Sequence, residues 1–168
     1  MATAVDEDEP AFVAALMGQD ELGIVVRAHI YIEARLIELL EHMVVDRKHL
    51  NQMDLDYAQR VHLTIALGLK PQHAPPLLAL GTLRNTFAHR PEAKLTKDRV
   101  DNLYKAFSSE DKKIVQAAFT RTDNKMLKKV GPNFRALPPT DQFVLMAVTL
   151  RSALSAAIIS LRREHDAP

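Results

Sequence analysis

Three side chains that can bind and transform a phosphate ester stand close together in the chain: Arg84, Asn85 and His89. A guanidinium binds anions, and an imidazole titrates near neutral pH, so that it can accept or donate a proton in a reaction. Pro91 disfavours a helical backbone at Arg90, so we expect a helix that ends near His89. The partial negative charge at this helix end stabilises an imidazolium. The spacing therefore predicts an anion-binding residue followed by a proton-transfer residue.

The helix before this group has one apolar stripe, because large apolar residues recur at steps of three and four: Leu77, Leu80, Leu83 and Phe87. Arg84 and His89 are five positions apart. On an ideal helix this spacing turns them about 140° away from each other. They can act on one substrate only if the chain unwinds at His89 or if a second subunit supplies one of them.

The order Arg, Asn, three residues, His resembles the signature of the HEPN superfamily, and the form RNxFAH is most similar to its mannitol operon repressor (MtlR-like) branch. The order of segments is also similar over roughly residues 15–107: a long helix, a polar loop, a shorter helix and the motif helix. The resemblance implies a single antiparallel helical bundle that is all-α. It also implies a homodimer with the two motifs near the two-fold axis.

The resemblance to the catalytic members of the HEPN superfamily implies an endoribonuclease of toxin or defence type that needs no metal and no cofactor. A base removes the proton of the ribose 2′-hydroxyl, an acid protonates the leaving 5′-oxygen, and a cation stabilises the phosphate. By this resemblance Arg84 would bind the phosphate and His89 would be the acid or the base. Asn85 would position either Arg84 or His89. The MtlR-like branch implies an alternative, a non-catalytic transcriptional regulator that acts through a protein partner. In that case the same residues would serve the fold or the interface.

The long helix expected from about residue 20 to residue 46 has two polar residues on its apolar face, His29 and Glu33. They are one turn apart, so they can contact each other. A buried carboxylate is costly without a partner. Either Glu33 pairs with His29 or an arginine inside the core, or it orients Arg84 by a bidentate ion pair.

A second basic feature is the segment 112–135, which has seven basic residues and one acidic residue. Such a segment can follow a phosphate backbone, and within it Lys125, Lys128 and Lys129 are the candidate RNA-binding residues. The alternative is a solvated helix face and loop.

Composition excludes several classes of protein. The chain has no cysteine, so it has neither disulfides nor thiolate metal sites, and its histidines lack the acidic neighbours typical of a metal site. The first eight residues are acidic and expected to be disordered, and they do not resemble a signal peptide. No uninterrupted apolar run approaches the ~20 residues of a membrane span. We therefore expect a cytoplasmic protein without membrane contact.

The remaining pattern predicts one domain over residues 9–165 with about six to seven helices and no strands. Residues 49–54 are expected to be a polar link. The final helix, residues 140–163, has a seam that should pack against the long helix or against a second subunit: Phe143, Ala147, Leu150, Leu154, Ala157 and Leu161. No helix-turn-helix is evident, so direct sequence-specific DNA binding is not expected.

Overall fold

Short polar side chains determine where the helices begin. Asp20 accepts a 2.7 Å hydrogen bond from the backbone N–H of Gly23, and Asp56 and Gln59 form a reciprocal capping box. The computed structural model describes residues 9–90, 92–122 and 131–165. In these residues the α-helices are α1 (Glu9–Leu16), α2 (Glu21–Met43), α3 (Arg47–Gln52), α4 (Tyr57–Ala66), α5 (Ala74–His89), α6 (Lys97–Ala106), α7 (Ser109–Arg121) and α8 (Pro139–His165). Two short 3₁₀ helices, Pro71–His73 and Phe134–Ala136, precede α5 and α8.

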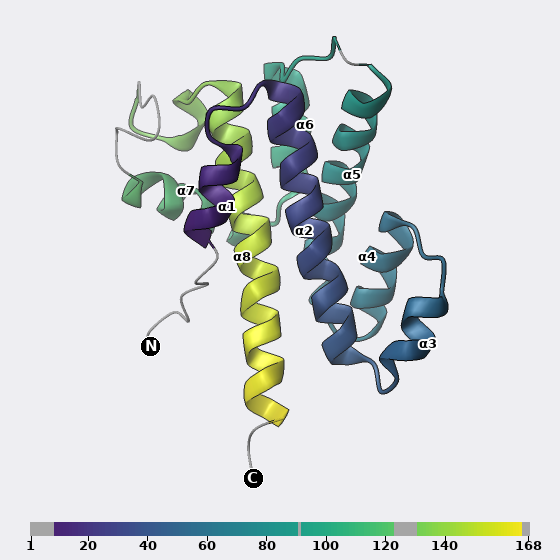
Figure 1. Cartoon of the computed structure of the whole chain (residues 1–168). Helices are drawn as coiled ribbons and strands as arrows, with labels where there is room; N and C mark the ends of the chain where they lie inside the picture. The colour runs from purple at the N-terminus through teal and green to yellow at the C-terminus, as the bar shows by residue number, and fades with distance from the viewer. Residues whose placement is uncertain (1–8, 91, 123–130, 166–168) are drawn as a thin grey trace.

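The centre of the bundle is the pair α2–α8, which makes the most extensive contact between any two helices described (Figure 1). Arg151 lies beside Arg35 in one surface hollow, and Arg162, further along α8, donates a 2.7 Å bond to Glu38. The two helices therefore run in the same direction, whereas α5 runs antiparallel to α2 (Figure 1). A single hydrophobic cluster includes buried residues of every α-helix except α3.

The predicted all-α bundle is confirmed. The seam of the final helix packs against α2, as one of its two predicted alternatives required, and most of its residues are buried. The polar link expected over residues 49–54 is wrong in part, because Arg47–Gln52 form the additional helix α3. Asp46 caps this helix, and Leu50 is its one buried residue. One apolar residue in six gives no periodic pattern, so the sequence did not show it.

Helix α8 is unusually apolar because much of it is buried in the bundle. Residues Pro139–Arg163 are long and apolar enough to cross a membrane by length and composition, contrary to the expectation from apolar runs. However, 56% of the most apolar window is buried inside the bundle, and the polar residues Gln142, Thr149 and Arg151 of α8 are also buried. The composition of α8 is thus accounted for by its place as a core helix.

The helix that carries the motif, α5, ends at His89 as predicted, and packs against α2, α4 and α6. Gly81 allows α4 to approach it closely. A Cβ atom at Gly81 would lie 2.8 Å from two ring carbons of Tyr57, so the aromatic ring rests directly on the α5 backbone. The Tyr57 hydroxyl donates a 3.0 Å bond to the carbonyl oxygen of Leu77, one turn earlier.

Candidate functional site

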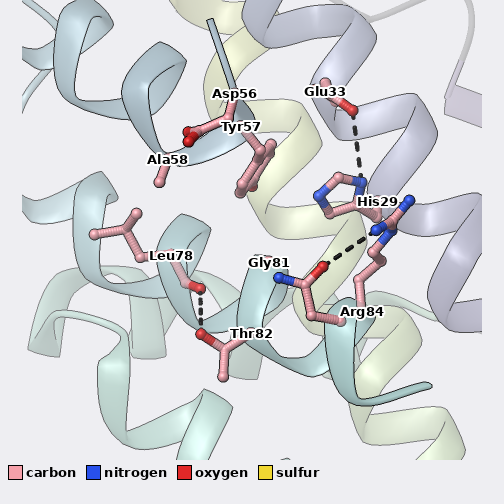
Figure 2. A pocket seen from close by; sticks show the side chains of 10 residues that line it. His29, Glu33, Asp56, Tyr57, Ala58, Leu78, Gly81, Thr82 and Arg84 are labelled. Atoms are coloured by element: carbon pink, nitrogen blue, oxygen red, sulfur yellow. Dashed lines mark hydrogen bonds and ion pairs between the residues drawn. The ribbon is translucent and has the colours of Figure 1, made fainter. Parts of the chain in front are cut away.

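A cleft of about 460 Å³ opens where α2, α4 and α5 meet (Figure 2). Helix α2 contributes His29 and Glu33 to its wall. The beginning of α4 and the middle of α5 contribute the remaining lining residues: Asp56, Tyr57, Ala58, Leu78, Gly81, Thr82, Arg84 and Asn85. Three of the four predicted catalytic or supporting residues, Arg84, Asn85 and Glu33, therefore lie in one cleft.

Arg84 is half-buried at the edge of this cleft, and its guanidinium lies beside the ring of His29 (Figure 2). It donates a 3.1 Å hydrogen bond to Oδ1 of the neighbouring Asn85, which is exposed. Among the described residues no carboxylate forms an ion pair with Arg84. The positive charge of Arg84 is thus held near the cleft surface by a neutral amide, and an anion can reach it.

His89 does not line the cleft. It is exposed at the last position of α5, and the chain remains helical up to it. The unwinding that could have turned His89 towards Arg84 within one chain is therefore absent. Within a single subunit the two residues point to different sides of α5.

Of the two alternatives that the sequence left open for Glu33, the pairing with Arg84 is not the one observed. Glu33 Oε1 accepts a 2.6 Å hydrogen bond from Arg60 on α4, and Glu33 Oε2 lies 3.7 Å from Nδ1 of His29. The alternative interpretation, a pair with His29 and a packing arginine, is the one observed. Arg60 was missed because it lies 27 residues from Glu33, and only the packing of α4 on α2 brings the two together.

Burial controls the protonation of the two rings in the cleft. His29 is 5% exposed and its ring centroid lies 4.3 Å from that of Tyr57. Burial lowers the pKa of His29, and the charge of Arg84 lowers it further, while Glu33 acts in the opposite direction. The pKa of Tyr57 is raised by burial and by the negative charge of Glu33. Near neutral pH the cleft therefore contains a neutral imidazole and a protonated phenol.

Sequence reasoning missed Asp56, Tyr57 and Gly81 as parts of the site. One signal was present: Gly81 is a lone glycine inside an apolar helix, a position that often marks the close approach of another element. Nothing in the local sequence identifies Tyr57 as that element, because its contact with Gly81 depends on how α4 packs.

The predicted RNA-binding residues Lys125, Lys128 and Lys129 lie outside the described residues, as does the acidic segment 1–8. Four other basic residues of the segment 112–135 are described: Lys112, Lys113, Arg121 and Arg135. Lys112 Nζ and the Arg135 guanidinium lie 5.2 and 4.8 Å from the centre of the Tyr104 ring, and Arg135 also bonds Asp101. Neither of these two residues lines the cleft.

In residues 9–90, 92–122 and 131–165 no group of three His, Asp or Glu side chains is arranged to hold a metal ion. The cleft can instead provide a cation, an amide, a neutral imidazole and two carboxylates. No protein-family model, no curated protein and no solved structure matches the chain.

Proposed function

We propose that this protein is a HEPN-like, metal-independent endoribonuclease whose active site is shared by two subunits. The observation that carries the proposal is the position of Arg84. Its guanidinium is half-buried at the edge of an open cleft and bonds a neutral side chain, Asn85, rather than a carboxylate. Because no carboxylate competes for this guanidinium, its free N–H groups can bind a phosphodiester.

The shared site follows from the separation of Arg84 and His89. The two residues are about 140° apart around α5 and about 7.5 Å apart along its axis. His89 is exposed and lies outside the cleft. In a two-fold dimer each surface meets its own copy, so the His89 of one subunit can approach the Arg84 of the other.

The outer face of α2 is the surface that we assign to the second subunit. Val26, Ile30, Ala34 and Ile37 recur at steps of three and four along it, and Ile30 is 56% exposed. This apolar stripe, residues 26, 30, 34 and 37, lies next to the cleft residues of α2. His29 is three positions from Val26, and Glu33 is three positions from Ile30, and residues at this spacing are neighbours on a helix surface. Packing the stripes of two subunits together would bury apolar surface and bring the two clefts close to each other.

The chemistry needs only groups that the motif supplies. The 2′-oxygen of the ribose attacks the adjacent phosphorus after losing its proton, and the bond from phosphorus to the 5′-oxygen breaks. Arg84 would stabilise the charge on the phosphate, Asn85 would hold the guanidinium, and His89 would transfer a proton. The products are a 2′,3′-cyclic phosphate and a 5′-hydroxyl. DNA lacks the attacking group and would not be cleaved.

One observation favours the alternative, a non-catalytic regulator that binds another protein. Glu33 and Asp56 also line the cleft, and among the described lining residues Arg84 is the only lysine or arginine. These two carboxylates repel a polyanion such as RNA, so its binding would require compensating cations outside the cleft. In this second function the apolar stripe of α2 would bind the partner protein, and Arg84 would be part of the same interface.

The test is incubation of the purified protein with end-labelled single-stranded RNA, and with DNA of the same sequence, in excess EDTA. We expect cleavage of the RNA alone. Replacing the phosphate-binding or proton-transfer group should lower the rate by about 100-fold or more, so the variants are Arg84→Ala and His89→Ala.

Matched controls are His62→Ala and Arg163→Ala, which remove an exposed histidine from α4 and an exposed arginine from the end of α8. Both should cleave like the wild type. RNA that stays intact with the wild-type protein, or equal cleavage by all four variants, would favour the regulator.

A further inference from the structure

We infer that His29 is the general base of this site, positioned by Glu33, and that it acts in the same subunit as Arg84. The inference rests on the proposed ribonuclease function and deepens it. It divides the proton transfers between two histidines: His29 would activate the 2′-hydroxyl, and His89 of the second subunit would protonate the leaving oxygen. The sequence motif contains only the second of these histidines.

The geometry of His29 is that of an oriented base. Its Nδ1 lies 3.7 Å from Glu33 Oε2, and the other ring nitrogen points away from Glu33 towards the middle of the cleft, on the side of Tyr57 and Gly81 (Figure 2). A carboxylate beside Nδ1 favours the tautomer with its proton on Nδ1, which leaves a free electron pair on Nε2. The Tyr57 ring, 4.3 Å away between centroids, fixes the orientation of the imidazole.

Glu33 is itself held in place. Arg60 donates a 2.6 Å bond to Glu33 Oε1, so the carboxylate cannot turn away from His29 without losing that contact. The series Arg60, Glu33, His29 thus leads from α4 through α2 into the cleft. A histidine oriented by a carboxylate that is in turn held by a third group is a recurrent arrangement for proton abstraction.

The charges around His29 keep it in the state that a base needs. Burial lowers its pKa and so does Arg84 on α5, while Glu33 on α2 counteracts them. The other ionisable groups at the cleft are the half-buried phenol of Tyr57 and the carboxylate of Asp56, both on the α4 side, together with Arg60 behind Glu33. The imidazole is therefore neutral at physiological pH and can accept a proton.

Nε2 of His29 takes the 2′-hydroxyl proton while the 2′-oxygen bonds to phosphorus. The bond from phosphorus to the 5′-oxygen breaks, and the 5′-oxygen takes a proton from the His89 imidazolium of the second subunit. The new positive charge on His29 is stabilised by Glu33, and Arg84 holds the phosphate throughout. Exchange with water then restores both histidines.

The experiment measures kcat/KM for RNA cleavage between pH 5 and 9 in excess EDTA for wild type, His29→Gln, Glu33→Gln and the control His62→Gln. We expect His29→Gln to lose about 100-fold or more in kcat with little change in KM, since it removes a general base and no phosphate contact. His62→Gln should match the wild type. In Glu33→Gln the carboxylate no longer raises the His29 pKa, so the acidic limb of the profile should move to lower pH.

A second measurement does not depend on activity or on the stability of His29→Gln. Nitrogen-15 NMR of the histidine rings in the wild-type protein reports the tautomer, and we expect the proton of His29 on Nδ1. Wild-type cleavage together with full activity of His29→Gln, or a proton on Nε2, would overturn the inference and leave the proposed function standing. If the wild type does not cleave RNA at all, the proposed function and the inference fail together.

Discussion

Glu33 of α2 and Arg60 of α4 are joined by a 2.6 Å hydrogen bond in which Arg60 donates to Oε1. This pair has two consequences for the cleft. It satisfies the carboxylate that lies on the apolar side of α2, and it leaves Arg84 with a neutral partner, Asn85. One arginine is thus used to hold the wall of the cleft, while the other stays accessible at its edge.

The Glu33–Arg60 pair should contribute to stability. Both side chains are less than one-third exposed, so Arg60→Ala leaves a partly desolvated carboxylate without its cation. We expect a loss of about 1–2 kcal/mol in the free energy of unfolding. Urea denaturation measures it, with Arg163→Ala as the control. A variant as stable as the wild type would show that the pair does not hold α4 against α2.

The long helices could be predicted from the sequence because their apolar residues recur with the helical period. The seam of α8 and the buried face of α2 are the clearest cases, and the end of α5 followed from Pro91. The helix α3 could not be predicted, since one buried residue, Leu50, carries no period. The direction of α8 relative to α2 depends on the connecting segments, and helical periodicity says nothing about direction.

The candidate site was predictable where its residues are neighbours in sequence. His29 and Glu33 are four residues apart, so helical geometry brings their side chains together. Arg84 and Asn85 are adjacent in the motif, so both could be identified from the sequence alone. The contribution of α4, which provides Arg60 and Tyr57, depends on tertiary packing. Whether Glu33 binds Arg60 or Arg84 is decided by that packing, and the sequence left both open.

Because Tyr57 packs directly on Gly81, the effect of Gly81→Ala on stability should depend on whether the tyrosine ring is present. Replacing glycine by alanine inside a helix normally stabilises it by up to about 1 kcal/mol. Here the new Cβ would lie 2.8 Å from a ring held by its hydroxyl bond to Leu77, and such overpacking costs about 1–3 kcal/mol. We therefore expect Gly81→Ala to lower the melting temperature.

In a Tyr57→Ala background the same Gly81→Ala change should be stabilising, because the ring is gone. The wild type, Gly81→Ala, Tyr57→Ala and the double variant form a thermodynamic cycle, and their four melting temperatures measure the coupling between the two positions. Equal effects of Gly81→Ala in both backgrounds would show that the ring does not rest on the helix backbone.

Stability should fall on mild acidification. The pKa values of His29 and His73 are lowered in the folded protein, chiefly by burial, so below about pH 6.5 the unfolded chain binds more protons than the folded one. The free energy of unfolding should decrease as the pH is lowered from 7.5 to 5.5, and His29→Gln should make this dependence shallower. Urea midpoints at three pH values measure it. Stability that rises towards pH 5.5 would contradict the burial of these rings.

The apolar stripe of α2 offers a direct test of the dimer. Ile30 and Ile114 are almost equally exposed, at 56% and 55%, but only Ile30 lies on the stripe. A charge at a dimer interface is desolvated without a partner, so Ile30→Glu should shift the protein to a monomer and abolish RNA cleavage, whereas Ile114→Glu should do neither. Light scattering coupled to size-exclusion chromatography measures the mass. Two variants with the same mass as the wild type would place the interface elsewhere.

The central claim, that Arg84 of one subunit works with His89 of the other, is tested most directly by mixing two inactive variants. Arg84→Ala and His89→Ala would be combined, allowed to exchange subunits, and assayed for RNA cleavage in excess EDTA. In random exchange half of the dimers are mixed, and one of the two sites in each mixed dimer has both residues, so about one-quarter of the wild-type activity should return. If the mixture stays as inactive as either variant alone while exchange is demonstrated, the two residues do not meet across the dimer.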